Sequence, residues 1–286
     1  MNIFVTDCEK GLYFYQHHTG ILSPIECSLP SPYMPCVTKD LLICACRIDL
    51  ECCCFDRRTQ AEVYRFPALP AMAALCVSPC ERYIFQLSSE ADCIHTRHLG
   101  SGDLLYGCKI GVFPRDMKLH PQKQLLMVAG GASGEAVLLQ TPHLTTYAKF
   151  QAPGCCCSVQ VWREGLVLLC AVENQQIETS VLTLAPSGFK PVELLRLEGQ
   201  PGSLCVCPDG EAALLGSLDG LMKICLRTGR ILWNLPHLIH CTDTVCRGSL
   251  ALAAGDISGQ VYLVPHEYPW LTNTIFTGRE TQACFA

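Results

Sequence analysis

The sequence predicts an all-β fold, a closed ring of seven blades with four antiparallel strands each, and three features carry this prediction. One unit, made of an apolar stretch, a short polar turn and a second apolar stretch, occurs seven times in the 286 residues. The units recur at a nearly constant interval. Gly, Pro, Asn and Asp lie between them, where turns require those residues. A repeat of this kind is typical of a β-propeller, which we predict as a single domain over residues 1–286.

The repeat interval was measured between marker residues at the start of each second apolar stretch. The markers are Gly11, Leu50, Asp92, Gly134, Gln176, Gly220 and Gly259, with spacings of 39, 42, 42, 42, 44 and 39 residues. The interval from Gly259 through the end of the chain and on to Gly11 is 38 residues. A propeller blade has about 40–50 residues. Seven blades of nearly equal length therefore account for the whole sequence.

The two ends of the chain predict how the ring closes. Each hairpin is preceded by one further strand-like stretch and followed by another, which makes four strands a blade. The chain begins directly in a hairpin at residues 3–15, without the stretch that should precede it. Residues 281–286, TQACFA, resemble that missing strand. We expect the C-terminal segment to pair with the N-terminal hairpin, which leaves no open sheet edge there.

Composition restricts the class of function. The net charge is −5, with no basic stripe, so nucleic-acid binding is not expected. The N-terminus lacks the features of a signal peptide and no uninterrupted run of 18 apolar residues occurs, so we expect a cytoplasmic protein that is not membrane-bound. Charged residues make up only 16% of the chain, which favours a partner, most simply another protein, that covers part of the surface.

The 22 cysteines are expected to be reduced thiols that pack as small apolar side chains in a reducing compartment. Cys44 and Cys46 share one strand face, and Cys52 and Cys54 share another. If the intervening turn centres on Asp49, the four thiols oppose one another and form a patch, a weak candidate for a metal site. If the turn shifts by one residue, the patch is broken.

The inner strands of the blades also carry cysteines. Aligning these strands places the following residues at one position: Cys36, Cys76, Lys118, Gln160, Cys205, Thr244 and Cys284. Packing between blades is the first interpretation, and a ring of thiols around the channel is the alternative. The run Cys155-Cys156-Cys157 before another inner strand is interpreted as packing too.

Other motifs are weaker. Two histidine pairs lie near a cysteine, namely His95 and His98 near Cys93, and His237 and His240 near Cys241. Surface or loop histidine is the expected role of both pairs, with metal binding as the alternative. The glycine-rich residues 129–136 lie between two strands and are expected to form a hairpin loop, because no helix N-terminus follows to hold phosphate.

Loops on one face of the ring are the expected binding surface, because loops held by a rigid scaffold carry function in such folds. They contain the candidate residues Tyr33, Glu90, Asp92, Arg115 and Asp116. Near the axis, Arg115 could bind a carboxylate or phosphate through two parallel hydrogen bonds. The chain has no GxSxG, GxGxxG, P-loop or HExxH motif, so we expect neither catalytic residues nor a cofactor.

Residues 207–235 resemble WD-repeat and quinoprotein-type propeller repeats. The resemblance rests on Pro208-Asp209-Gly210, Asp219-Gly220, Thr228-Gly229 and Trp233, which fall where those families place turns and a packing tryptophan. Residues 77–106 are similar. The Gly-His and Trp-Asp dipeptides of WD repeats are absent, and the chain also resembles the bacterial YVTN-like propellers. Such families include scaffolds, sensors and a few enzymes, so the resemblance implies a fold more than a function.

Three functions from different classes therefore follow as hypotheses. The first is a non-catalytic interaction or scaffold propeller that binds a protein or a small ligand on its loop face. The second is a small-molecule hydrolase, such as a lactonase, acting at the propeller axis. The third is a cysteine-based metal or redox protein.

Overall fold

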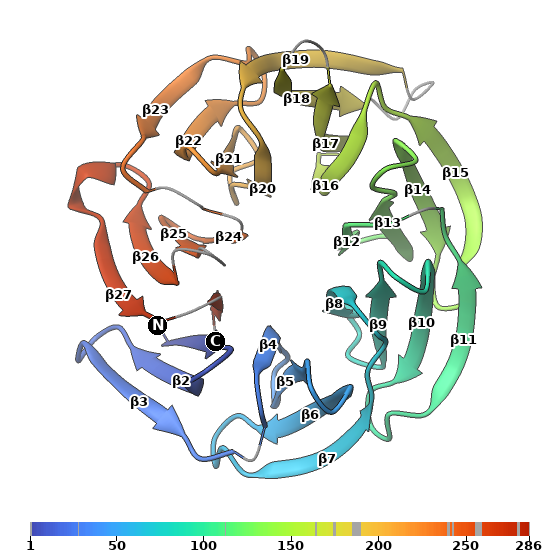
Figure 1. The fold of residues 1–286 in the computed structure, drawn as a ribbon, viewed down its shortest axis with the longest axis vertical. Helices are drawn as coiled ribbons and strands as arrows, with labels where there is room; N and C mark the ends of the chain where they lie inside the picture. Colours follow the sequence, from blue (N-terminus) through green and yellow to red (C-terminus); the bar gives the residue numbers. More distant parts are fainter. Residues whose placement is uncertain are drawn as a thin grey trace.

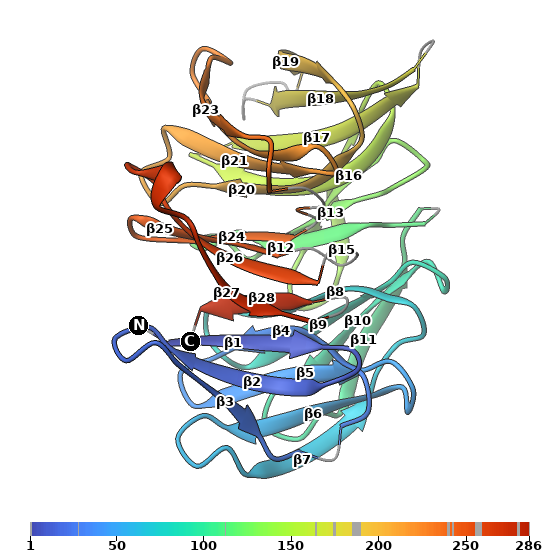
Figure 2. The ribbon, with the colours of Figure 1, turned by 60° about the vertical axis from the view of Figure 1, so that its left-hand side comes forward.

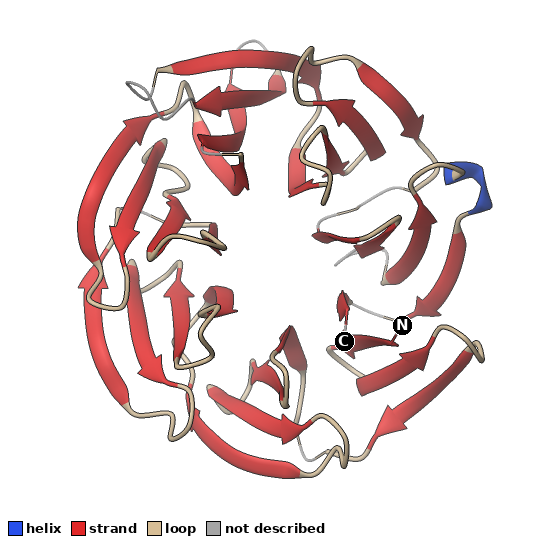
Figure 3. Cartoon of the chain, turned by 180° about the vertical axis from the view of Figure 1, so that it is seen from behind, coloured by secondary structure: helices blue, strands red, loops and turns tan. Residues whose placement is uncertain are grey.

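The computed structural model describes residues 2–27, 29–111, 113–163, 165–173, 176–184, 190–238, 241, 243–254, 259–278 and 281–285. In these residues seven four-stranded antiparallel sheets surround a central axis, which confirms the predicted seven-bladed ring (Figure 1). The described residues contain one short 3-10 helix, η1 (Pro269–Leu271), seen at the rim in Figure 3. None of their helical segments has the length and hydropathy needed to cross a bilayer.

The strands of each blade follow one another outward from the axis. The first three blades comprise the strands up to residue 109 together with the C-terminal strand. Blade 1 contains β28 (Gln282–Phe285), β1 (Asn2–Asp7), β2 (Gly11–Gln16) and β3 (Ile21–Ile25). Blade 2 contains β4 (Pro32–Val37), β5 (Leu41–Cys46), β6 (Glu51–Asp56) and β7 (Glu62–Pro67). Blade 3 contains β8 (Met72–Val77), β9 (Tyr83–Ser88), β10 (Cys93–His98) and β11 (Leu104–Lys109).

The remaining four blades follow in chain order. Blade 4 contains β12 (Asp116–Leu119), β13 (Leu125–Ala129), β14 (Glu135–Gln140) and β15 (Thr145–Gln151). Blade 5 contains β16 (Cys155–Trp162), β17 (Gly165–Glu173), β18 (Ile177–Leu184) and β19 (Pro191–Glu198). Blade 6 contains β20 (Pro201–Val206), β21 (Ala212–Ser217), β22 (Gly220–Cys225) and β23 (Ile231–Leu235). Blade 7 contains β24 (Asp243–Arg247), β25 (Leu250–Ala254), β26 (Gln260–Pro265) and β27 (Asn273–Thr277).

The predicted markers fall at the central hairpins of the blades. The third strand of every blade begins at its marker or one residue after it. Six of the seven markers adopt a positive φ, for example 102° at Gly11 and 147° at Gly220. A left-handed residue commonly ends a short hairpin loop, and glycine adopts that conformation without steric cost. At Gly220 a Cβ would also lie 2.8 Å from the carbonyl oxygen of Leu235. Turn geometry thus explains the repeat that the sequence shows.

The core consists of seven apolar clusters, and each cluster joins one blade to the next. Between blades 2 and 3, for instance, Ile43 and Cys54 pack in one cluster with Ile84. Between blades 7 and 1, Val261 packs with Ile3 and Phe285. The second and third strands of the blades are therefore mostly apolar and are covered on both faces, with a few buried polar side chains such as Gln86 and Thr96, while the outermost strands are largely exposed. This explains why the sequence shows continuous apolar stretches rather than strict alternation.

Ring closure occurs as predicted. The C-terminal strand β28 pairs antiparallel with β1, with Ile3 opposite Phe285 and Val5 opposite Ala283. The ends of the chain consequently lie side by side within blade 1 (Figures 1 and 2). The Thr6 hydroxyl also donates a hydrogen bond to the carbonyl oxygen of Gln282, at 3.4 Å. Blade 1 is thus assembled from segments at opposite ends of the sequence.

The inner-strand alignment needs one correction. Six of the aligned residues sit at one position of the register, each opposite the third residue of the neighbouring strand, as Lys118 is opposite Met127. In blade 7 the equivalent residue is Val245, opposite Leu252, and not Thr244. The predicted alignment was therefore wrong by one residue there. The corrected register places Asp243 at the same position as Asp116, two residues before Val245 and Lys118 respectively.

Replacing the closing aromatic residue should weaken the whole ring. Phe285 is only 9% exposed, so Phe285→Ala is expected to lower the free energy of unfolding by about 3 kcal/mol, as for other buried phenylalanines. Tyr147→Ala, at a side chain that is 57% exposed on β15, should change it by less than about 0.5 kcal/mol. Equilibrium urea denaturation measures both. Equal stabilities for the two variants would show that β28 contributes little to ring stability.

Candidate functional site in the axial channel

The inner strands of the seven blades surround the ring axis (Figure 3), and we call the space between them the channel. A cavity of about 250 Å³ opens in it, lined by residues of the inner strands of all seven blades. This volume is slightly below the usual range for drug-sized ligands, so the cavity suits a small molecule. The polar side chains in its wall are Arg115, Asp116, Lys118, Ser158, Ser203, Asp243, Thr244 and Gln282.

Asp116 organises one side of this cavity. Its carboxylate accepts hydrogen bonds from the Ser158 hydroxyl at 2.5 Å and from the Val159 backbone N–H at 3.2 Å, both in blade 5. The Lys118 ammonium lies 3.3 Å from its other oxygen, which also accepts the backbone N–H of Met117. Asp116 therefore joins blades 4 and 5 and fixes the position of the Lys118 side chain.

The surroundings in the channel favour the charged form of Lys118 and the neutral form of Asp243. The Asp116 carboxylate is the main cause that raises the pKa of Lys118, and Asp243 adds to it, so the ammonium is charged at neutral pH. Burial raises the pKa of Asp243, and the Lys118 charge only partly opposes that effect. Asp243 comes from blade 7, three blades away from Lys118 in blade 4. The ring thus brings one cation and two carboxyl groups together from distant parts of the sequence.

The four aligned inner-strand cysteines, Cys36, Cys76, Cys205 and Cys284, lie near these charges. Burial raises the pKa of Cys36 to about 11 and raises the pKa values of Cys76 and Cys284 as well. The Lys118 charge acts on Cys36 and Cys76, and Cys205 in turn acts on Lys118. Cys36, Cys76 and Cys284 pack against the apolar clusters between blades, in line with the first interpretation, and of the four only Cys284 also lines the cavity. Their raised pKa values keep Cys36, Cys76 and Cys284 protonated at neutral pH.

The five candidates on the loop face separate into different roles. Arg115 and Asp116 line the cavity. Tyr33 is buried, with its ring 5.1 Å from the Arg47 guanidinium, and burial raises its pKa to about 12. The carboxylate of Asp92 accepts the Phe113 backbone N–H at 2.8 Å, which holds the loop that leads into β12. Glu90 is exposed at the tip of the β9–β10 hairpin.

The four-thiol patch of blade 2 does not form. Cys44 lies opposite Cys53, and Cys52 lies opposite Ala45, so the register is the shifted one of the two alternatives. Cys44 and Cys46 pack in the core between blades 1 and 2, whereas Cys52 and Cys54 pack in the core between blades 2 and 3. The thiols therefore face opposite sides of the blade and cannot surround one metal ion.

The remaining sequence motifs are also placed. Cys155-Cys156-Cys157 begins β16, with Cys156 in the core and Cys157 at the channel. In blade 3, His98 is exposed and its Nδ1 lies 3.3 Å from the Ser101 hydroxyl. Cys241 donates its S–H to the Leu238 carbonyl, and His240 lies outside the described residues. The glycine-rich segment 129–136 spans the β13–β14 hairpin loop, as predicted.

Sequence reasoning missed Asp243 as a site residue. The signal was present, because Asp243 is the counterpart of Asp116 once the blade 7 alignment is shifted by one residue. An acidic residue at the same inner-strand position in two blades indicates a shared channel environment. The misplaced Thr244 hid this match.

Comparison with known proteins defines the class of this molecule by its fold. No protein-family model and no curated protein matches the chain. A suspected 6-phosphogluconolactonase from Bacteroides uniformis superposes with a TM-score of 0.75 at 13% identity over 99% of both chains. A protein of unknown function from Desulfotomaculum acetoxidans has a TM-score of 0.76 at 9% identity, over 99% of this chain and 98% of that one. Hydrazine synthase from Kuenenia stuttgartiensis has a TM-score of 0.74 at 14% identity, over 86% of this chain and 79% of that one. At these identities the likeness shows the seven-bladed propeller fold alone.

Thiol labelling should separate the cysteines by accessibility. All 22 are free, Cys80 is exposed, and hydrogen bonds from Thr228 and nearby backbone N–H groups lower the pKa of Cys225. Iodoacetamide should therefore modify Cys80 and Cys225 first. The buried Cys52 and Cys53, whose pKa values burial raises to about 12, should react only after denaturation. Peptide mass spectrometry at successive times measures the order, with Cys80→Ser as the control, and early labelling of Cys52 would contradict the packing of blade 2.

Removing the channel cation should make stability depend more steeply on pH. Lys118→Met leaves Asp116 and Asp243 without their ammonium, so the folded-state pKa of Asp243, already raised, rises further. An acid whose folded pKa exceeds its unfolded value loses stability as pH rises above the unfolded value. We expect a loss of about 1–2 kcal/mol at pH 8 and less at pH 5, discounted because the Lys118 side chain is 44% exposed to the channel.

Urea denaturation at the two pH values measures this effect. Lys149→Met is a matched control, because it removes a solvent-exposed pair with Glu135 and should cost less than about 0.5 kcal/mol at either pH. A Lys118→Met variant that loses equal stability at pH 5 and pH 8 would contradict the assignment of coupled charges in the channel.

Proposed function

We propose that the protein is a non-catalytic binding propeller that holds a small, hydroxylated organic acid in its axial channel. The observation that carries this proposal is the convergence of Asp116, Lys118 and Asp243 on the wall of one cavity. Titratable groups with perturbed pKa values in a cavity, as Lys118 and Asp243 have here, are typical of functional sites. A purely structural role would be served at lower cost by apolar side chains, because burying charges requires desolvation.

The polar wall determines the chemical class of the ligand. Lys118 and Arg115 offer positive charge to a carboxylate at the loop end of the cavity. Asp243 offers acceptor oxygens to ligand hydroxyl groups on the opposite side. A ligand with one carboxylate and several hydroxyls satisfies these groups together, and buried polar groups favour such satisfaction.

Calorimetric titration with gluconate tests the proposal. Gluconate should bind to the wild-type protein, and Asp243→Asn and Lys118→Met should each weaken the affinity by about tenfold or more, the scale of one lost charge-assisted hydrogen bond. Lys149 lies on the outermost strand β15, away from the cavity, so Lys149→Met should bind like the wild type. Glucose, which lacks the carboxylate, should bind more weakly. Absence of binding at millimolar gluconate, or equal affinity in Asp243→Asn, would contradict the proposal.

Lactone hydrolysis is a second candidate function, and the raised pKa of Asp243 is the observation that favours it. A carboxyl group with a raised pKa is suited to accept a proton from an attacking water, and the Lys118 ammonium is suited to stabilise the carbonyl oxygen as it gains charge. The suspected 6-phosphogluconolactonase with the same fold makes sugar lactones the first substrates to try. Acid release from glucono-δ-lactone above the uncatalysed rate, lost in Asp243→Asn, would favour hydrolysis over binding alone.

A further inference from the structure

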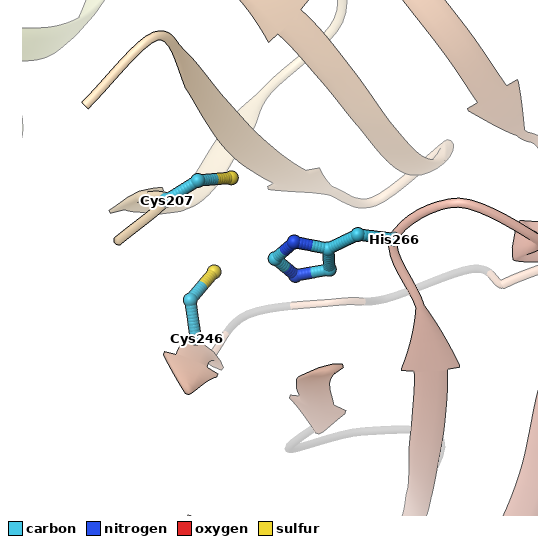
Figure 4. A group of neighbouring side chains, drawn as sticks. All are labelled: Cys207, Cys246 and His266. Carbon is cyan, nitrogen blue, oxygen red and sulfur yellow. The ribbon is translucent and has the colours of Figure 1, made fainter. Parts of the chain in front are cut away.

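A cluster of soft metal-ligating atoms lies between blades 6 and 7, away from the channel cavity. Cys207 follows β20, Cys246 lies on β24, and His266 follows β26. Their sulfur and ring nitrogen atoms all lie within 4.8 Å of one another, and they form the one such group of three found in the described residues. Figure 4 shows the two sulfurs and the nitrogen-bearing edge of the imidazole turned toward a common point. None of the three lines the cavity proposed to bind a ligand.

The histidine of this cluster is buried with an unsatisfied nitrogen. His266 is 8% exposed, and its Nε2 has no hydrogen-bond partner within the described residues. Its backbone is held on both sides, because its N–H donates to the Ser249 carbonyl at 2.9 Å and its carbonyl accepts the Trp233 indole N–H at 3.2 Å. A buried nitrogen without a partner costs free energy unless something else binds it. The fixed backbone aims the ring at the two thiols.

We propose that Cys207, Cys246 and His266 bind a zinc ion. Zinc prefers thiolate and imidazole ligands at about 2.3 Å and 2.0–2.1 Å in a tetrahedral arrangement. Such an arrangement separates ligand atoms by about 3.5–3.8 Å, so the three side chains need to approach one another by about 1 Å at most. Side-chain rotation alone supplies a movement of that size. The donor set, two sulfurs and one nitrogen, favours zinc over hard cations such as Mg²⁺ or Ca²⁺.

The protonation of the cluster is compatible with metal binding. A hydrogen bond from Cys246, helped by His266, lowers the pKa of Cys207 to about 5. Zinc binds the thiolate form of cysteine, so metal binding releases the proton of any ligand thiol. Cys246 retains its proton in the absence of metal, because the hydrogen bonds with Cys205 and Cys207 raise its pKa. Zinc would displace that proton.

Cys205 offers a fourth ligand. It lies on β20, two residues before Cys207, and its thiol forms a hydrogen bond with Cys246, although it lies outside the group of three whose ligand atoms are all within 4.8 Å of one another. Structural zinc sites are usually closed by four protein ligands, three cysteines and one histidine being one of the common sets. With Cys205 the site would bind together β20, β24 and the segment after β26. Zinc would therefore stabilise the contact between the last two complete blades before the ring closes.

Metal analysis of the whole protein tests the site. Protein stripped with chelator under reducing conditions, incubated with excess zinc and desalted, should retain one zinc per chain by mass spectrometry. Cys207→Ser, Cys246→Ser and His266→Asn should each lose the zinc. Cys241→Ser is the matched control, because Cys241 is buried in the same core cluster but its thiol donates to the Leu238 carbonyl, and this variant should retain the zinc.

Cobalt substitution gives a second, spectroscopic readout, on the wild-type protein for the site itself and on one variant for the fourth ligand. Cobalt bound to the wild-type protein should show thiolate-to-metal charge-transfer absorption and the visible bands of tetrahedral coordination. A lower charge-transfer intensity in Cys205→Ser identifies that residue as the fourth ligand, and an unchanged intensity assigns the fourth position to water. Wild-type protein that retains no zinc and gives no cobalt–thiolate absorption would overturn the proposal, as would equal zinc loss in Cys241→Ser.

Discussion

The constraint on which this structure depends is that every blade packs against an apolar cluster on each of its two faces. The four strands of a blade cannot shield their own two faces from water, so a neighbouring blade has to cover each face. The seven apolar clusters, one between each pair of adjacent blades, are the result. A ring satisfies this requirement for all blades at once, whereas an open row of blades would leave two apolar faces in water.

The channel chemistry is a consequence of that packing. Because the inner strands surround one axis, polar residues on them are brought together in the wall of one cavity. Lys118 is stabilised there by Asp116, while Asp243 carries a desolvation cost that Lys118 only partly offsets. Charges in a partly enclosed cavity are screened less than charges on the open surface. The cavity wall therefore carries fixed charges of both signs before any ligand binds.

The fold could be predicted from the sequence because the repeat depends on local turns. Residues such as Gly11 and Gly220 end hairpin loops in the left-handed conformation and recur from blade to blade. The sequence did not predict details that depend on one residue of register. Leu50 adopts a positive φ of 50°, which non-glycine residues seldom do, and it ends a four-residue loop, residues 47–50, so the turn centres between Ile48 and Asp49 instead of on Asp49. The group of Cys207, Cys246 and His266 could not be predicted either, because it comes from three elements with no local spacing that marks them.

The origin of β28 has a consequence for synthesis on the ribosome. Residues 2–7 leave the ribosome long before residues 282–285, which form their partner strand. Until residues 282–285 have been synthesised, β1 exposes one row of unpaired backbone groups, and the apolar face that blade 7 will cover stays in contact with water. The nascent chain is therefore an open arc whose two ends can pair with those of another chain. Exchange of β28 between two such chains would produce an interlocked dimer of the same blades.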